Sequence, residues 1–149
     1  MHIPLKYGHS TLTFDIDGLA SHVDVLASGR ACPECDETTL IKNALARPIG
    51  SPPLADLVSP GQRVVIVTSD VTRPCPSVLL LPHVLDELNR GGVRDHDITA
   101  VFGLGTHRSQ TDVERTALVG EQVYRCVKCI DSDPADVRFI GCTRPMPAS

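Results

Sequence analysis

The fold is decided by the stretch Arg63-Val64-Val65-Ile66-Val67-Thr68-Ser69-Asp70-Val71-Thr72-Arg73-Pro74. Its first part is a continuous run of β-branched residues. Continuous rather than alternating apolarity predicts a strand that is covered on both faces, which is typical of a parallel sheet. A helix is expected next, over Ser77–Arg90, and a second apolar strand over residues 98–102. A strand, a helix and a strand in this order predict a βαβ unit with parallel strands.

Further elements are expected before this unit. Alternating apolar residues predict strands over residues 12–16 and 22–26. Asp36 is the expected N-cap of a helix whose apolar residues share one face. Residues 46–61 are rich in proline and glycine, which predicts a loop with one short helical turn inside it.

Elements after the unit complete the expected fold. The sequence Thr111-Asp112-Val113-Glu114 fits a capping box, so a helix should begin at Asp112. Short strands are expected over residues 127–130 and 137–140. We therefore predict the α/β class, with a parallel-sheet βαβ (Rossmann-like) domain that spans residues 1–149 and is incomplete at its C-terminus.

Composition excludes several classes of protein. With 42% hydrophobic and 21% charged residues, the chain resembles a folded globular domain rather than a disordered one. A net charge of −4 without a basic run argues against nucleic acid and anionic membranes as partners. Its apolar runs are far shorter than the ~18 residues of a transmembrane helix, and its N-terminus lacks the apolar core of a signal peptide. We therefore expect a cytoplasmic location, where cysteines stay reduced or bind metal.

Two loops form the candidate site. The first covers residues 69–74 and follows the β-branched strand. The second is Gly103-Leu104-Gly105-Thr106-His107-Arg108, which follows the strand over residues 98–102. If these strands are parallel neighbours, both loops emerge at their carboxyl ends, the edge at which open α/β sheets bind ligands.

The residue types in the two loops suit a small anionic ligand. Arg73 offers a planar fork for a carboxylate or phosphate. Asp70 could orient that arginine or accept a hydrogen bond from a ligand hydroxyl. Gly103 and Gly105 let backbone N–H groups approach a ligand closely. Histidine is the side chain that exchanges protons near neutral pH, so His107 is the natural proton carrier.

Simpler interpretations of these loops remain open. An Asp-x-x-Arg pair after a strand often forms a helix cap and a surface ion pair, and a histidine in a glycine loop is often only solvated. The Gly-x-Gly-x-x-Arg pattern lacks the third glycine of a dinucleotide fingerprint, and no Gly-Lys-Ser/Thr of a phosphate-binding loop follows it. The loops alone therefore predict a small-ligand site and leave its chemistry open.

Taken together, the loops and their flanks resemble the N-terminal domain of the nickel-pincer-dependent lactate racemase family. The matching stretches are Leu5-Lys6-Tyr7-Gly8, Asn43-Ala44-Leu45, Pro48-Ile49-Gly50-Ser51-Pro52-Pro53-Leu54, Val65-Ile66-Val67 through Ser69-Asp70-Val71-Thr72-Arg73-Pro74, Pro76-Ser77, Leu79-Leu80-Leu81-Pro82, Gly105-Thr106-His107-Arg108 and Leu118-Val119-Gly120. The resemblance implies an isomerase that interconverts the D and L forms of a small 2-hydroxy acid. It also implies a nickel ion in a pincer mononucleotide, which takes hydride from the substrate carbon and returns it to either face.

The resemblance further implies roles for individual residues. Asp70 and Arg73 would bind the substrate, with Arg73 on the carboxylate. His107 would be one of two acid/base histidines and would remove the hydroxyl proton as hydride leaves. The site-adjacent candidates are Thr72, Gly105, Thr106 and Arg108. No residue of this chain is assigned as a metal ligand.

The chain departs from the family pattern, first of all in length. The resemblance places the lysine that tethers the cofactor, the histidine that ligates nickel and the second acid/base histidine beyond residue 149. We therefore expect the chain alone to be inactive, as a fragment, a truncated product or one part of a split enzyme with a separate C-terminal half. Asp131-Ser132-Asp133 stands where relatives often carry Asn-His-Asp, and Ser109-Gln110 replaces the commoner Pro-Met.

The cysteines leave a second class of function open. Cys32 with Cys35 and Cys126 with Cys129 form two C-x-x-C pairs, which could build a Cys₄ zinc site in a non-catalytic α/β module. The pairs are far apart in the chain, and positions three apart in a strand face opposite sides, so free and partly buried thiols are the favoured interpretation. A third hypothesis is a small anion-binding domain that uses Arg73 without any chemistry at His107.

Overall fold

The structure is a computed structural model of the 149-residue chain, and it describes residues 2–18, 22–24, 26 and 35–139. The chain divides into two compact units, Met1–Glu34 and Cys35–Ser149. Each unit is described by itself.

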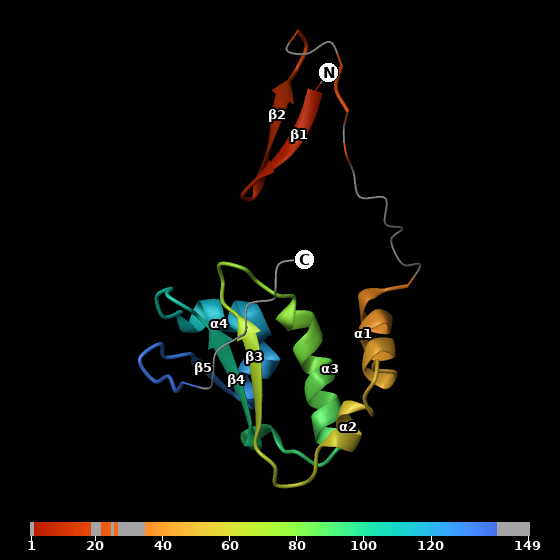
Figure 1. The fold of residues 1–149 in the computed structure, drawn as a ribbon, viewed down its shortest axis with the longest axis vertical. Helices are drawn as coiled ribbons and strands as arrows, with labels where there is room; N and C mark the ends of the chain where they lie inside the picture. Colours follow the sequence, from red (N-terminus) through yellow and green to blue (C-terminus); the bar gives the residue numbers. More distant parts are fainter. Residues whose placement is uncertain (1, 19–21, 25, 27–34, 140–149) are drawn as a thin grey trace, which may run out of the picture. The chain divides into compact units, whose positions relative to one another are not determined.

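The first unit contains a β-hairpin (Figure 1). Strand β1 (His2–Tyr7) pairs antiparallel with strand β2 (Ser10–Asp15), and the pairing begins at Tyr7 and Ser10. Gly8 in the turn has a φ of 58°, a left-handed conformation that glycine adopts at little cost. The predicted strand over residues 12–16 is confirmed as β2. The strand predicted over residues 22–26 is wrong, because residues 22–24 and 26 adopt no regular structure.

The second unit begins with two helices. Helix α1 (Glu37–Ala46) starts as predicted, because Oδ1 of Asp36 accepts a hydrogen bond from the backbone N–H of Thr39 at 2.9 Å. Helix α2 (Leu54–Leu57) is the short turn expected within the proline-rich loop. Both helices pack against helix α3 (Ser77–Arg90), whose bounds agree with the prediction.

A three-stranded parallel sheet forms the centre of the second unit (Figure 1). Its order is β3 (Val64–Ser69), β4 (Ile98–Gly103) and β5 (Lys128–Asp131). Strand β4 pairs in parallel with each neighbour. The α/β class and the parallel βαβ arrangement are thereby confirmed.

The connection between β4 and β5 contains two helices, of which the sequence predicted one. Helix α4 (Asp112–Val119) begins with the expected capping box of Thr111 and Glu114. Helix α5 (Glu121–Cys126) follows directly after Gly120, whose φ of 86° turns the chain between the helices. A 3₁₀ turn at Asp95–Asp97 precedes β4. The strand predicted over residues 137–140 is wrong for residues 137–139, which form no strand.

The hydrophobic core lies between the sheet and the helices. Ile98, Ala100 and Phe102 alternate along β4 and are completely buried, because all three face the helical layer. The core residues that the helices place against them are Leu81, Leu85 and Leu88 from α3, Leu118 and Val119 from α4, and Val123 from α5.

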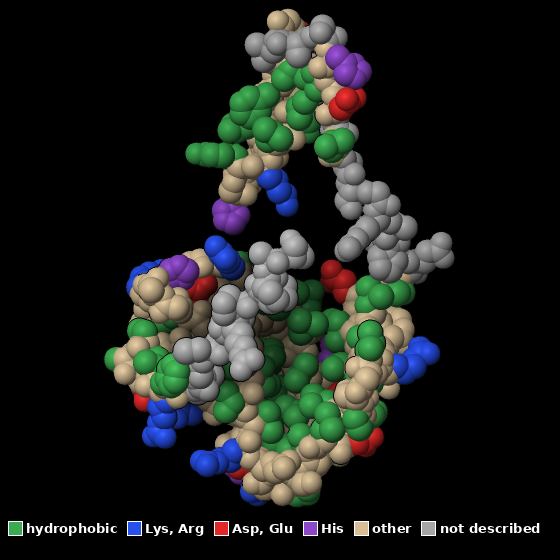
Figure 2. Space-filling view, viewed as in Figure 1, with side chains coloured by type: hydrophobic (Ala, Val, Ile, Leu, Met, Phe, Trp, Pro, Cys, Tyr) green, Lys and Arg blue, Asp and Glu red, His purple; other side chains and the backbone are tan. Residues whose placement is uncertain are grey.

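The opposite face of the sheet is less covered than the sequence predicts. Val65 and Val67 of β3 are 63% and 73% exposed, so the expectation of a strand covered on both faces is wrong for β3. The physical reason is that Val64 and Ile66 pack against the core, so Val65 and Val67, which alternate with them along β3, face the other side of the sheet. A separate group of apolar side chains is visible between α1 and β3, where α3 lies (Figure 2).

Candidate functional site

The two candidate loops emerge side by side at the carboxyl edge of the sheet. Ser69 at the end of β3 is opposite Gly103 at the end of β4, so the loops that follow them start as neighbours. In the second loop the backbone N–H of His107 donates to the carbonyl of Leu104 at 3.0 Å and closes a tight turn. Gly105 inside this turn has a φ of +58°, which explains why a glycine stands there.

Asp70 and His107 meet across the gap between the loops. Oδ2 of Asp70 lies 2.5 Å from Nδ1 of His107, and the Thr72 hydroxyl donates to Oδ1 of Asp70 at 2.7 Å. The Thr72 hydroxyl also lies 3.3 Å from Nδ1 of His107. The Asp70 carboxylate is almost fully buried, whereas half of the His107 side chain is exposed. Asp70 and Thr72 therefore hold the Nδ1 side of the imidazole, and half of the His107 side chain remains accessible to solvent.

The protonation of this cluster follows from its hydrogen bonds. The Thr72 hydroxyl and, second, His107 lower the pKa of the Asp70 carboxyl below its ordinary value of 3.8, against the opposing effect of burial. At neutral pH Asp70 is thus a carboxylate, which can only accept hydrogen bonds. In the neutral form of the His107 ring, Nδ1 therefore carries the hydrogen and Nε2 keeps its lone pair.

Arg73 follows this cluster on the first loop and is exposed. Among the described residues, the structure gives the Arg73 guanidinium no hydrogen bond or ion pair. The idea that Asp70 orients Arg73 is not supported, because the Asp70 carboxylate makes its hydrogen bonds to Thr72 and His107 and none to Arg73. Asp70 and His107 therefore come together as expected, and Arg73 is left as an unpaired cation on the same loop.

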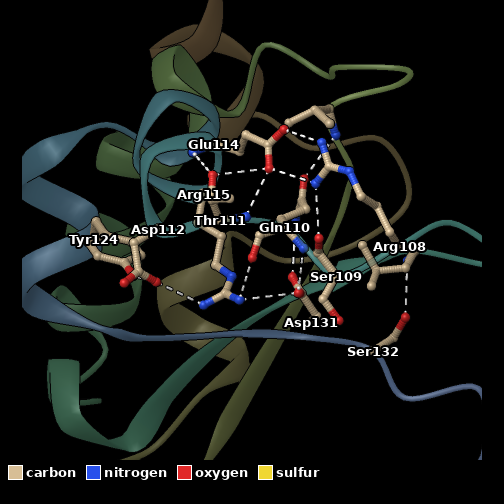
Figure 3. A network of polar contacts seen from close by, with 12 residues as sticks. Arg108, Ser109, Gln110, Thr111, Asp112, Glu114, Arg115, Tyr124, Asp131 and Ser132 are labelled. Carbon is tan, nitrogen blue, oxygen red and sulfur yellow. Dashed lines mark hydrogen bonds and ion pairs between the residues drawn. The ribbon is translucent and has the colours of Figure 1, made fainter.

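Arg108, unlike Asp70 and His107, makes its contacts with residues near the start of α4. Its guanidinium makes two hydrogen bonds to the Glu114 carboxylate, at 2.9 and 2.6 Å, and another to the carbonyl of Ser109 (Figure 3). Hydrogen bonds from Arg108 and from the backbone of Thr111 lower the pKa of Glu114 from 4.5 to about 2. Arg108 thus ties the second loop to the start of α4, while Thr106 beside it is exposed.

A buried network behind the loops was missed by sequence reasoning (Figure 3). Gln110 is 4% exposed, and both its backbone N–H and its side-chain amide donate to the Asp131 carboxylate. Arg115 of α4 donates to Oδ2 of Asp131 at 3.2 Å. Burial raises the pKa of Asp131, but hydrogen bonds from Gln110 and Arg115 outweigh it and leave that pKa below its ordinary value. The signal was available, because Asp131 ends the third parallel strand at the same sheet edge.

Comparison with known proteins assigns the fold and loops to a family. Residues 7–145 match the family model described as the lactate racemase N-terminal domain. The chain belongs to the lactate racemase N-terminal domain family. Two lactate racemases are similar to it: that of Thermoanaerobacterium thermosaccharolyticum is 34% identical over 123 residues, and that of Lactiplantibacillus plantarum is 32% identical over 144 residues.

A solved structure supports the same assignment for this lactate racemase homologue. The apoprotein of lactate racemase from Thermoanaerobacterium thermosaccharolyticum matches 89% of the chain with a TM-score of 0.64 and 31% identity. The match covers 30% of that structure, and the two curated relatives are covered over 29% and 34% of their lengths. The chain therefore spans about a third of the lactate racemases that it resembles.

Metal binding has no visible basis in the described part of this lactate racemase homologue. No group of three or more histidine, cysteine or acidic side chains within residues 2–18, 22–24, 26 and 35–139 could hold a metal ion. The described residues therefore do not by themselves fit a nickel centre. Cys35, Cys75, Cys126 and Cys129 are free, and Cys32 of the first C-x-x-C pair lies outside the described residues. No described helix is long and apolar enough to cross a membrane.

Proposed function

We propose that this chain is the N-terminal part of a lactate-type 2-hydroxy-acid racemase and supplies one side of its substrate site. The observation that carries this proposal is the 2.5 Å contact between His107 and Asp70 at the carboxyl edge of the sheet. In this proposal Arg73 binds the substrate carboxylate, and Asp70 acts through His107 rather than on the substrate.

His107 has the geometry of a general base in this proposal. Asp70 holds Nδ1, so Nε2 is the nitrogen that remains to accept a proton, and half of the side chain is accessible to a ligand. Nε2 would take the hydroxyl proton when the 2-hydroxy acid is oxidised to the 2-keto acid, and return it on reduction. The buried Asp70 carboxylate would stabilise the imidazolium that forms between these steps.

Arg73 has the features of the carboxylate-binding residue in this proposal. It is exposed and its guanidinium has no partner among the described residues, so binding a ligand breaks no existing ion pair. A planar guanidinium can donate two parallel hydrogen bonds to a carboxylate, which fixes the orientation of the acid as well as its position. Both the hydroxy acid and the keto acid carry this carboxylate, so Arg73 would hold both.

The hydride of the substrate carbon needs an acceptor, which the nickel-pincer mononucleotide implied by the family would supply. Within the described residues, no group of three or more histidine, cysteine or acidic side chains could hold its nickel ion. We therefore propose that the chain is inactive alone and acts with a further segment, supplied by a longer polypeptide or by a separate C-terminal half. Racemisation by the isolated chain, given the cofactor and a 2-hydroxy acid, would contradict this part of the proposal.

Titration of the isotopically labelled chain with L-lactate, D-lactate and propionate tests the substrate proposal. Propionate keeps the carboxylate and lacks the hydroxyl group. We expect lactate to shift the NMR signals of Arg73 and the His107 ring, and to bind several-fold more tightly than propionate, because only lactate offers a hydroxyl to Nε2. Arg73→Ala should weaken binding roughly tenfold, whereas Arg125→Ala, which removes an exposed arginine of α5, should leave it unchanged.

The same titration and a metal analysis test the two alternatives. Equal affinity for lactate and propionate, unchanged by His107→Ala, would indicate an anion-binding domain without chemistry. Metal analysis of the purified chain tests the zinc module: about one zinc per chain, lost in Cys126→Ser, would support the Cys₄ site.

Exchanging the matching segment of the Thermoanaerobacterium lactate racemase for residues 7–145 then tests activity, and His107→Gln in that chimaera should reduce racemisation at least ~100-fold.

A further inference from the structure

Gln110 joins the three loops at the carboxyl edge of the sheet. Its side-chain carbonyl accepts a hydrogen bond from the backbone N–H of Val71 at 3.0 Å. Its side-chain NH₂ group and backbone N–H donate to the two oxygens of Asp131 at 3.2 and 2.9 Å, and its backbone carbonyl accepts from Arg115 at 2.7 Å. All four of its polar groups are thus satisfied inside the protein, at a residue that is 4% exposed.

We propose that Gln110 is a positioning residue, which sets the orientation of the Asp70 turn relative to His107. Val71 lies between Asp70 and Thr72, the two residues that contact the imidazole. Gln110 itself belongs to the segment that carries His107. The two loops are therefore joined at the imidazole, by Asp70 and Thr72, and separately by the Gln110 amide. The separate attachment limits rotation of one loop relative to the other.

The chemistry of the network explains why an amide occupies this position. Asp131 is held as a carboxylate by Arg115 and Gln110, so it accepts hydrogen bonds and donates none. The end of the Gln110 side chain that faces Asp131 must therefore be the NH₂ group. The carbonyl is then left for the backbone N–H of Val71, a group that can only donate. Neither a carboxylate nor a hydrocarbon side chain could serve both neighbours.

A pair of substitutions that exchanges the two groups tests this assignment. Gln110→Glu puts a second carboxylate against Asp131 and should push the side chain away from Val71. The double variant Gln110→Glu with Asp131→Asn restores one amide and one carboxylate in reversed order, so the contact with Val71 can form again. The control is Asn89→Ala, which removes hydrogen bonds to Val93 and Asp95 at the C-terminal end of α3.

Two NMR measurements on the 149-residue chain serve as readouts: hydrogen exchange of the Val71 amide and the titration of the Asp70 carboxyl. In Gln110→Glu we expect Val71 to exchange roughly tenfold faster, and the Asp70 pKa to rise toward its ordinary value because Thr72 and His107 are no longer held in place. The double variant should return both quantities to those of the wild type. Asn89→Ala should leave both quantities unchanged, even when its loss of overall stability equals that of Gln110→Glu.

The outcomes distinguish the positioning role of Gln110 from the proposed function. The positioning role bears on catalysis through that proposed function. Wild-type Val71 exchange and Asp70 titration in Gln110→Glu would overturn the positioning role, and so would failure of the folded double variant to restore them. Lactate binding is not part of either readout. If lactate fails to bind while both readouts respond, the proposed function falls and the positioning role of Gln110 stands.

Discussion

Asp70 and His107 are 37 positions apart in the chain, yet Oδ2 of the first lies 2.5 Å from Nδ1 of the second. The contact exists because β3 and β4 are parallel neighbours whose ends are in register, so each loop starts beside the other. The same contact selects one nitrogen of His107 as the exposed acceptor. The position of one carboxylate thus determines which atom of the imidazole is available for chemistry.

Replacing Asp70 by asparagine should change the tautomer of His107. In the wild type the carboxylate requires the hydrogen on Nδ1, whereas an asparagine amide can donate to Nδ1 and move the hydrogen to Nε2. Long-range ¹H–¹⁵N spectra of the ring distinguish the two forms. We expect Nε2 to change from unprotonated to protonated in Asp70→Asn. Asp97→Asn, which alters an acid before β4, should leave the ring pattern unchanged.

Replacing Thr72 by valine should raise the pKa of Asp70. The Thr72 hydroxyl is the largest cause of the low pKa of this carboxyl, ahead of His107, and valine has the same shape without the hydroxyl. ¹³C NMR titration of the Asp70 carboxyl measures the change. Thr72→Ser keeps the hydroxyl and should titrate like the wild type. A wild-type titration in Thr72→Val would mean that the hydroxyl does not control this acid.

Acid should remove part of the stability in a defined pH window. The pKa of Glu114 is about 2 in the folded protein, against an ordinary value of 4.5. Between these pH values Glu114 is therefore protonated in the unfolded chain and ionised in the folded protein. The stabilisation is complete above pH 4.5 and is lost as the pH falls toward 2. The lowered pKa of Asp70 acts in the same direction.

Urea unfolding at a series of pH values between 6 and 2.5 checks this window. The wild type should lose stability steadily below about pH 4.5. Glu114→Gln, which cannot titrate, should be less stable at pH 6 and should show a flatter decline below pH 4.5. Parallel curves for the two proteins would indicate that the Arg108 pair contributes nothing to the acid sensitivity.

Substitutions at Gly105 should reveal the strain of the His107 turn. An added Cβ atom at Gly105 meets no atom within 4 Å, so the whole cost of Gly105→Ala comes from its φ of +58°. We expect a loss of about 1 kcal/mol in the free energy of unfolding. Gly105→Asn should cost less, because asparagine tolerates this conformation. Gly103→Ala is the matched control, since its Cβ would make an ordinary contact at 3.5 Å and needs no left-handed backbone.

Much of the fold could be predicted because local signals agreed with it. The bounds of α3 follow from its apolar periodicity and from Gly91-Gly92 at its end, and the capping box of Thr111 marks the first turn of α4. The hairpin strand β1 was missed, because Pro4 and Lys6 interrupt the pattern of an apolar strand. Helix α5 was missed because its six residues are too few for a clear helical period.

The candidate site was predictable where it depends on strand order and not where it depends on side-chain partners. Parallel β3 and β4 place Asp70 and His107 at one edge, as expected. The exclusive pairing of Asp70 with Thr72 and His107 could not be read from spacing, because Arg73 is equally close in sequence. Gln110 gave no signal at all, since a polar residue in a loop is normally solvated.

The exposed side chains of Val65 and Val67 on β3 predict how soluble the protein is at high concentration. Among the described residues β3 pairs with a strand on one side only, and it also exposes apolar side chains. Such an edge strand favours association between copies of the chain, so concentrated samples should aggregate. A single lysine in place of Val67 should keep such samples clear in light-scattering measurements, while the signals of His107 on the neighbouring loop stay where they were.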